Sequence, residues 1–290
     1  MSRKSLALGA VVAATLAATL ATPASAITDG AIDSTGAHPN VGVVVMYDAE
    51  GPLWRCTATL IADDVLVTAA HCTEAPATHA IVSFDTYIRE DFAPYLPPSE
   101  GDDAWNPATE GGSYMDPDTG HTWYAGQTHT SPKYSGFTDI KNWNDYGVVT
   151  LDGPVPGIEP AELAPVGYLD TVKQPTLNKT LFTTVGYGTT VVKPDEGPRK
   201  PVASGANIIR QIAQEPGQKL SPQILQVNGN GNDNRGTGGT CFGDSGGPTF
   251  LDGYLVAVTS YGYTLNCRYL DGLQRVDIPI AQDWISSFLD

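Results

Sequence analysis

The chain has 290 residues, of which 17% are charged, and a formal net charge of −16. A surface this acidic repels phosphate backbones, so we expect no nucleic-acid partner. The 31 glycines and 22 prolines favour many turns between short strands over long helices. The composition therefore predicts an all-β protein.

Residues 1–26 have the pattern of an export signal. Two basic residues precede an apolar run over residues 6–20, and the small residues of a signal-peptidase site follow at 24–26. The run is too short for a membrane anchor and no other long apolar run follows it, so we expect a secreted product without a membrane span. Cleavage after residue 26 changes the formal charge from −16 to −18 and makes Ile27 the first residue. An earlier cleavage, after residue 21, would leave residues 22–26 as a short extension.

Apolar and β-branched runs recur along the mature chain. We expect strands at residues 41–47, at 56–71 in two runs around a turn at 63–64, and at 181–187, 208–212 and 224–227. A hairpin is predicted over residues 248–261, around Asp252-Gly253. An apolar stripe at helical spacing predicts one C-terminal helix, with Pro279, Ile280, Trp284, Ile285, Phe288 and Leu289 on its apolar side.

Residues 85–118 differ from the rest of the chain. They hold nine acidic residues, one basic residue and five prolines, so we expect a surface excursion and not a core element. Residues 116–120 resemble a fragment of a calcium loop but lack its remaining ligands, so a solvated loop is favoured over a structural calcium site. Residues 228–236, rich in Gly and Asn, predict a mobile loop. We expect no metal site.

The four cysteines suit an oxidising compartment and two disulfides. They are Cys56, Cys72, Cys241 and Cys267, and three connectivities are open. Pairing within each local pair, 56 with 72 and 241 with 267, closes short loops. The chain has no Cys-x-x-Cys pair, which disfavours zinc.

The segment TCFGDSGGP, residues 240–248, carries the strongest chemical signal. It places Ser245 among glycines that permit a sharp turn and a close approach of substrate. The N–H groups of Gly243 and Ser245 can then point at one place, where a carbonyl oxygen would become negative. A serine nucleophile needs a base, and His71 in TAAHC, at the end of an apolar strand, is the candidate. The imidazole in turn needs a carboxylate to orient it.

TAAHC followed by GDSGGP resembles the trypsin/chymotrypsin-like serine proteases, whose triad runs His, Asp, Ser along the chain. The resemblance extends from the mature N-terminus, Ile27-Thr-Asp-Gly, to the terminal helix. It implies two packed antiparallel six-stranded β-barrels and a C-terminal helix. Residues 27–155 would carry His71 and Asp145, and residues 156–290 would carry Ser245 and the specificity pocket. It also implies a monomer without a cofactor that cleaves proteins or peptides and is open to protein protease inhibitors.

Three carboxylates compete for the third place in the triad. Asp145 precedes an apolar strand at 146–151, as the catalytic acid of the family does. Asp139 is followed by polar residues that cannot form a buried strand, and Asp152 comes after the strand. We therefore assign Asp145.

The resemblance implies a substrate-binding set of Gly239, Thr240, Ser260, Tyr261, Gly262 and Gly272. Gly239 stands six residues before Ser245, where relatives that cleave after Arg or Lys carry a carboxylate. An uncharged pocket favours large apolar or aromatic P1 side chains, and basic specificity through Asp271 is the alternative. A homologue without activity that acts as a binding module is disfavoured, because all three triad residues and Gly243 are present.

Two departures from the family affect substrate positioning. Thr57 and Ala58 replace the two glycines usual after the first cysteine, and Tyr261 replaces the usual tryptophan. The mature N-terminus fits the family better. There, a freed N-terminal amine pairs with the acid before the nucleophile, here Ile27 with Asp244. Signal-peptide cleavage after residue 26 would free this amine during export, without a separate zymogen.

Overall fold

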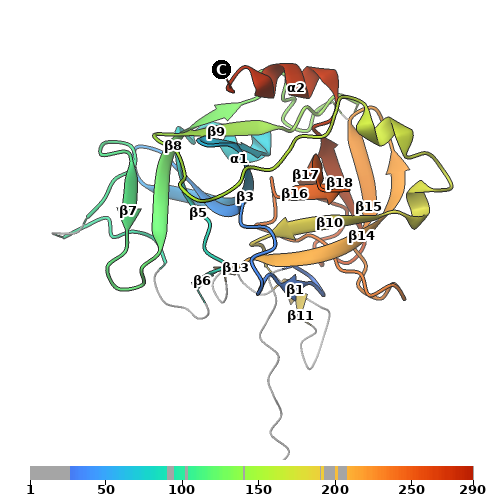
Figure 1. Ribbon diagram of the computed structural model, residues 1–290, viewed down its shortest axis with the longest axis horizontal. Helices are drawn as coiled ribbons and strands as arrows, with labels where there is room; N and C mark the ends of the chain where they lie inside the picture. The colour runs from blue at the N-terminus through green and yellow to red at the C-terminus, as the bar shows by residue number, and fades with distance from the viewer. Residues whose placement is uncertain are drawn as a thin grey trace, which may run out of the picture.

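The computed structural model describes residues 27–89, 95–101, 104–139, 141–189, 191–192, 200–201 and 208–289. Within these ranges the chain forms two closed β-barrels that lie side by side (Figure 1). The expectations for residues 1–26 lie outside the described residues. No helix in the described part of the chain is both long enough and apolar enough to cross a membrane.

Six antiparallel strands close the first barrel. In chain order they are β2 (Val41–Tyr47), β3 (Pro52–Ala62), β4 (Val65–Thr68), β5 (His79–Ser83), β8 (Thr122–Thr130) and β9 (Gly147–Leu151). Their spatial order is β5-β2-β3-β4-β9-β8, and pairing of β5 with β8 completes the ring. The short strand β7 (Ser113–Met115) pairs with β8 on its outer side. A single helical turn, α1 (Ala70–Thr73), follows β4.

The second barrel has the same plan. Its strands are β10 (Leu181–Gly186), β14 (Gln211–Leu220), β15 (Ile224–Asn228), β16 (Pro248–Leu251), β17 (Tyr254–Gly262) and β18 (Leu270–Arg275). Pairing of β14 with β15 closes it, and β1 (Ala31–Ile32) adds to β14. The smaller elements are η1 (Tyr168–Thr171), η2 (Leu177–Lys179), the pair β6 (Tyr87–Arg89) and β13 (Ile208–Ile209), and the pair β11 (Val191–Val192) and β12 (Lys200–Pro201).

One apolar core is continuous across the two barrels. It joins Val41 and Val43 of β2 to Val185 of β10 and Val258 of β17. Because side chains alternate along a strand, every second residue points inward and fills the interior of its own barrel. The strands that face the other barrel share the continuous apolar core, which we call the barrel seam. The seam fixes how residues from the two barrels meet.

The C-terminal helix α2 (Pro279–Ser286) lies across both barrels (Figure 1). Ala281 and Ile285 are buried, and the Trp284 ring lies 5.6 Å from the ring of Tyr146 at the start of β9. Proline suits the first helical position, because an N–H at that position would have no acceptor within the helix and its absence costs nothing.

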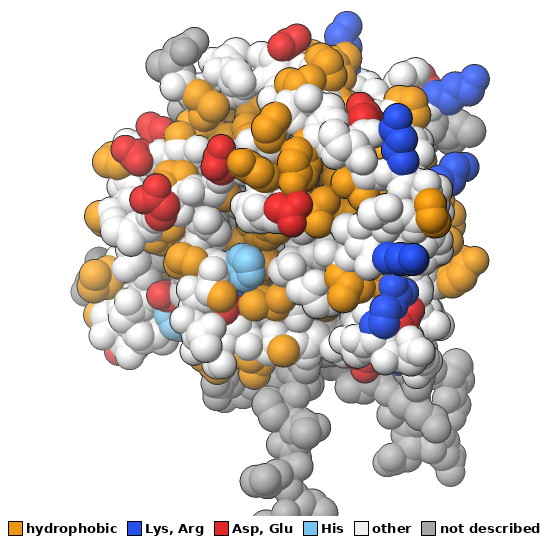
Figure 2. Space-filling view, turned by 45° about the vertical axis from the view of Figure 1, so that its right-hand side comes forward, with side chains coloured by type: hydrophobic (Ala, Val, Ile, Leu, Met, Phe, Trp, Pro, Cys, Tyr) orange, Lys and Arg blue, Asp and Glu red, His pale blue; other side chains and the backbone are white. Residues whose placement is uncertain are grey.

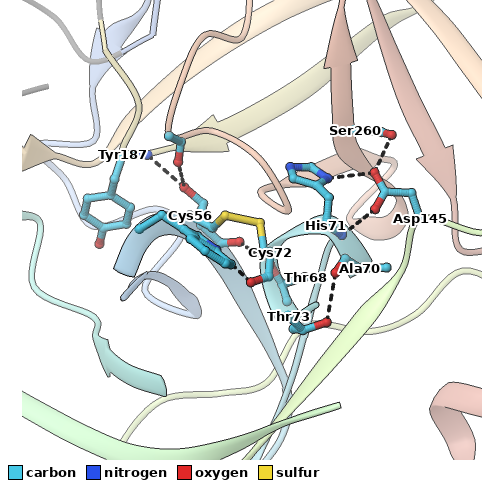
Figure 3. Close-up of a disulfide and its surroundings, with 12 residues drawn as sticks. Cys56, Thr68, Ala70, His71, Cys72, Thr73, Asp145, Tyr187 and Ser260 are labelled. Atoms are coloured by element: carbon cyan, nitrogen blue, oxygen red, sulfur yellow. Dashed lines mark hydrogen bonds and ion pairs between the residues drawn. A yellow bond between two sulfur atoms is a disulfide. The ribbon is translucent and has the colours of Figure 1, made fainter. Parts of the chain in front are cut away.

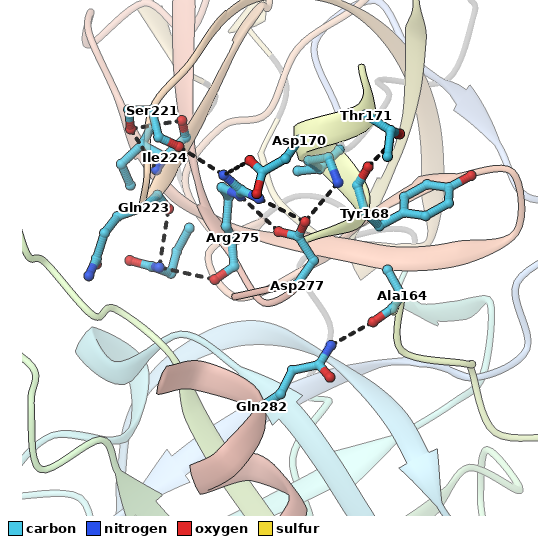
Figure 4. Close-up of polar contacts among 12 residues, drawn as sticks. Ala164, Tyr168, Asp170, Thr171, Ser221, Gln223, Ile224, Arg275, Asp277 and Gln282 are labelled. Atoms are coloured by element: carbon cyan, nitrogen blue, oxygen red, sulfur yellow. Dashed lines mark hydrogen bonds and ion pairs between the residues drawn. The ribbon is translucent and has the colours of Figure 1, made fainter. Parts of the chain in front are cut away.

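A buried ion-pair network fixes the chain just before α2 (Figure 4). Arg275 is 2% exposed and donates two hydrogen bonds of 2.8 Å to the Asp277 carboxylate. It donates a third, of 2.9 Å, to Asp170 of η1. A buried guanidinium is tolerated only when its donors are satisfied in this way. In the helix itself, Gln282 donates to the Ala164 carbonyl at 2.6 Å.

The predicted all-β class, the two barrels, the hairpin and the C-terminal helix are confirmed. Both local disulfides form, Cys56–Cys72 and Cys241–Cys267.

The expectation that residues 85–118 contain no core element is wrong. Ile88 and Trp105 are 4% and 9% exposed and pack into the main core, and β6 and β7 both pair with other strands. The acidic composition of the segment conceals these few apolar anchors. The Asp116 carboxylate accepts the N–H groups of Asp118 and Thr119 within its own turn.

Candidate active site

His71 is placed by one helical turn and a disulfide. It lies in α1, directly after β4, and its neighbour Cys72 is bonded to Cys56 of β3 (Figure 3). The Trp54 indole donates a 2.8 Å hydrogen bond to the Cys72 carbonyl. These contacts hold the backbone of His71 against the first barrel.

The Asp145 carboxylate holds His71 by two hydrogen bonds. Its Oδ1 accepts the backbone N–H of His71 at 2.9 Å, and its Oδ2 lies 2.9 Å from Nδ1 of the imidazole (Figure 3). The carboxylate is completely buried, while the imidazole is 20% exposed. Burial by itself would lower the pKa of His71, but the charge of Asp145 and its hydrogen bond raise the pKa above its usual value.

Asp145 is itself held from the second barrel. The Ser260 hydroxyl donates to Oδ2 at 2.6 Å, and the backbone N–H of Asp145 donates to Gln274 Oε1 at 3.0 Å. Both of these residues belong to strands of the second barrel. The competing carboxylates lie elsewhere. Asp139 is exposed and bonds within its own turn, and Asp152 accepts the N–H of Gly112.

Ser245 lies in the loop before β16, on the second barrel. Gly243 adopts a φ of 99°, which favours glycine. Within the described part of the chain, the N–H groups of Gly243 and Ser245 have no hydrogen-bond acceptor. The same loop reaches the first barrel, because a Cβ on Gly246 would meet Ala69 N, two residues before His71, at 2.6 Å. Ser245 and His71 form no hydrogen bond to each other among the described residues, and such bonds are often long in unliganded enzymes.

A cavity of about 410 Å³ adjoins Ser245. Four of the six predicted substrate-binding residues line it, namely Thr240, Ser260, Tyr261 and Gly262. The remaining two, Gly239 and Gly272, are not among its lining residues. Gly239 packs against the backbone of Gly229, and the Tyr261 ring covers Gly272. These glycines allow close packing behind the cavity and do not form its wall.

Aromatic side chains that the sequence did not indicate form much of the cavity wall. Phe137 and Trp143 come from the loop before Asp145, and the Phe137 ring lies 5.7 Å from the His71 ring. Trp143 lies 4.2 Å from Tyr261, ring to ring. Figure 2 shows one face of the molecule, on which hydrophobic side chains gather near the middle with acidic side chains among them. No motif marks Phe137 or Trp143, because their position depends on how the loop folds back.

Two buried carboxyl groups lie behind the cavity. The backbone N–H of Thr240 donates to both, to Glu215 Oε1 at 3.0 Å and to Asp271 Oδ2 at 3.1 Å. Burial and their mutual repulsion raise the pKa of Glu215 well above its usual value, and burial raises the pKa of Asp271 to about 7. Asp271 lies near Gly262 of the cavity wall but is only 2% exposed. Glu215 was missed because it lies within an ordinary strand.

The N-terminal segment is already buried beside the second barrel. Ile27 is 0% exposed, and its nitrogen donates to Gln211 Oε1 at 2.9 Å. This nitrogen is a peptide nitrogen, since residue 26 precedes it. Asp244 accepts the N–H groups of Gly188 at 2.7 Å and Cys241 at 2.8 Å. Burial raises the pKa of Asp244 to about 7.

One group of potential metal ligands occurs among the described residues: His71, Cys56 and Cys72. Both sulfurs are consumed in the disulfide, so neither can act as the thiolate that a metal would need. This group does not fit a metal ion.

Comparisons with known proteins identify relatives of this chain. The family model described as Trypsin matches residues 116–285. Brachyurin of Leptuca pugilator is 25% identical over 246 residues, which cover 81% of this chain and 88% of the relative. A solved structure described as HL collagenase superimposes with a TM-score of 0.58 and 18% identity, covering 91% of this chain and 98% of the other. The last likeness concerns the fold alone.

Proposed function

The chain belongs to the trypsin family of serine proteases, and we propose that it is a secreted endopeptidase that uses Ser245, His71 and Asp145 as its triad. Ser245 Oγ attacks the substrate carbonyl and forms an acyl-enzyme, while His71 takes the proton and later returns it to the leaving amine. Asp145 orients His71 and stabilises its protonated form. The N–H groups of Gly243 and Ser245 receive the oxyanion. The reaction requires no cofactor.

The observation that carries this proposal is the pair of hydrogen bonds between His71 and Asp145, next to a cavity that Ser245 lines. The buried carboxylate raises the pKa of the imidazole, which makes it a stronger base. A binding module would have no need for this arrangement.

We propose that the cavity prefers large apolar or aromatic P1 side chains. Its wall is rich in aromatic residues, including Trp143 and Tyr261, and desolvation of an apolar side chain there is favourable. Basic P1 side chains are the second candidate, because the Asp271 carboxyl lies directly behind Gly262 and Thr240.

We also propose that export frees the Ile27 amine and that this amine pairs with Asp244. Ile27 is already buried in the uncleaved chain, where its nitrogen donates to Gln211 Oε1; pairing with Asp244 would require the freed amine to exchange this partner. An ammonium group would compensate a carboxylate that burial otherwise keeps close to neutral. The mature enzyme would act as a monomer on proteins or peptides and would be open to protein protease inhibitors.

A serine-directed phosphonate probe and a set of peptide anilides that differ only at P1 test this function. We expect the probe to label Ser245 and the anilides with Phe or Leu at P1 to be cleaved fastest. Ser245→Ala should lose both labelling and cleavage. Labelling at another residue, or full activity in Ser245→Ala, would refute the triad. Cleavage after Arg but not after Phe would instead favour the basic candidate.

A further inference from the structure

Thr57 occupies a position where the family usually has glycine. It follows Cys56 in β3 and is 0% exposed. A side chain at this place lies between the two barrels, against the loop that carries Ser245.

Every hydrogen-bonding group of Thr57 has a partner. Its N–H donates to the Ser245 carbonyl at 2.8 Å, and its carbonyl accepts the Thr68 hydroxyl at 2.9 Å. The Thr57 hydroxyl donates to the Gly243 carbonyl at 2.9 Å and accepts the N–H of Tyr187 at 3.1 Å. Figure 3 shows the bond from Tyr187 in this network beside the Cys56–Cys72 disulfide.

These bonds act on the two residues whose N–H groups face the substrate. Gly243 has a φ of 99° and, like any glycine, can rotate its peptide groups at little steric cost. The Thr57 hydroxyl fixes the carbonyl of Gly243, and the Thr57 N–H fixes the carbonyl of Ser245. These two bonds hold the peptide planes that follow Gly243 and Ser245, and so restrict rotation of the adjoining backbone that carries the two N–H groups.

A buried hydroxyl that both donates and accepts stabilises one arrangement strongly. Loss of the hydroxyl leaves the Gly243 carbonyl and the Tyr187 N–H buried without this hydrogen-bond partner. Because unpaired buried polar groups cost free energy, this loss favours a rearrangement of the loop. Rearrangement of a peptide in the oxyanion hole reduces the stabilisation of the transition state more than it reduces the affinity for substrate.

We propose that the Thr57 hydroxyl, which belongs to the first barrel, is a positioning group for the oxyanion hole and helps to hold Gly243 in place. It rests on the proposed function, since it presupposes that Gly243 and Ser245 bind an oxyanion. It supplies a residue outside the loop that determines kcat without touching the substrate.

The test compares Thr57→Val, which keeps the shape and removes the hydroxyl, with Thr57→Ser, which keeps the hydroxyl. We expect Thr57→Val to lower kcat for a peptide anilide about 10- to 100-fold with KM changed less than about threefold, and Thr57→Ser to restore most of the activity. Thr59→Val is the matched control. Thr59 is two residues further along β3, is equally buried, and its hydroxyl has no partner among the described residues. It should leave kcat unchanged.

A second readout separates positioning from general damage. In a peptide aldehyde inhibitor, Ser245 Oγ bonds to the aldehyde carbon, the serine proton moves to His71, and the carbonyl oxygen becomes an oxyanion-like group. The inhibition constant of the aldehyde should rise in Thr57→Val by about the factor by which kcat falls. The corresponding peptide alcohol forms no such bond, so its inhibition constant should stay the same.

The inference is overturned if Thr57→Val and Thr59→Val behave alike, or if the aldehyde and the alcohol lose affinity equally. If Thr57→Val does not fold, Thr57→Ala makes the same comparison with less steric demand. Failure of the proposed function looks different, because the unaltered enzyme would then neither cleave the anilide nor bind the aldehyde more tightly than the alcohol.

Discussion

The Ser260 hydroxyl donates a 2.6 Å hydrogen bond to Asp145 Oδ2, the same oxygen that faces Nδ1 of His71. Ser260 belongs to β17 of the second barrel, whereas His71 belongs to α1 of the first. The contact therefore fixes the acid across the barrel seam. The hydroxyl also stabilises part of the negative charge on Oδ2, which would otherwise act on the imidazole alone.

Ser260→Ala should lower kcat/KM about 10-fold, because Oδ2 loses a short charge-assisted bond and Asp145 gains freedom to move. The pKa of His71 should rise further, since the carboxylate is then less neutralised by hydrogen bonding. The dependence of kcat/KM on pH gives both values in one experiment. Ser287→Ala, which removes an exposed hydroxyl bonded only within α2, is the control and should change neither.

The raised pKa of His71 should set the acid limit of activity. The imidazole must be neutral to accept a proton, so kcat/KM should fall as pH drops through a pKa that lies above the ordinary value of 6.5. In Asp145→Asn the negative charge and one of the two accepting oxygens are lost, burial then dominates, and the pKa of His71 should fall below 6.5. The residual activity should be about 10⁴-fold lower.

Asp139→Asn serves as the control for this experiment, since Asp139 is exposed and bonds only within its own turn. Its profile should match that of the unaltered enzyme. An equal loss in both variants would contradict the assignment of Asp145.

Local alternation in the sequence predicted the strands, whereas the two-barrel fold and the candidate triad followed from the family resemblance that short segments carry. Alternation defines the strands, and TAAHC and GDSGGP are short segments whose neighbours fix their shape. The partners of these segments were not predictable in the same way. Ser260 was expected to bind substrate, and its bond to Asp145 depends on the register of β17, which no local pattern contains. The burial of Trp105 was not predicted for the same reason, because it depends on core residues that are distant in the sequence.

The Asp271 carboxyl should make P1 preference depend on pH. Its pKa is raised to about 7 by burial, so it is neutral in acid and ionised in alkali. Glu215 shares the Thr240 N–H with it, and Asp244 interacts with it electrostatically; both are acids and cannot compensate its negative charge. The ratio of kcat/KM for P1 Arg to that for P1 Phe should therefore rise severalfold between pH 6 and pH 8.5. In Asp271→Asn this ratio should be low and independent of pH, and a persistent rise would assign the effect to another group.

The Asp29–Arg268 ion pair links the N-terminal segment to the cavity wall. The carboxylate lies 2.8 Å from the guanidinium of Arg268, which follows Cys267 of the wall. Asp29 has a φ of 56°, so Asp29→Gly relieves backbone strain while it removes the ion pair. We expect KM to rise about two- to fivefold without loss of thermal stability, because a partly exposed pair contributes little to folding. Arg268→Ala should have the same effect, and the double variant should be no worse than either single one.

Retention of residue 26 should leave the protein folded but weakly active and less stable at neutral pH. In the uncleaved chain Asp244 titrates at about 7, against 3.8 when exposed, so the folded form keeps a proton that the unfolded form has released. Its stability should therefore fall as pH rises from about 4 to about 7, by on the order of 4 kcal/mol. A free Ile27 amine would pair with the ionised carboxylate and cancel this loss.

Thermal unfolding of the two forms, both carrying Ser245→Ala to prevent self-digestion, should give similar midpoints at pH 5 and a higher midpoint for the cleaved form at pH 7.5. Equal midpoints at both pH values, together with full activity of a homogeneous sample that retains residue 26, would show that the Ile27 amine has no part in shaping the site.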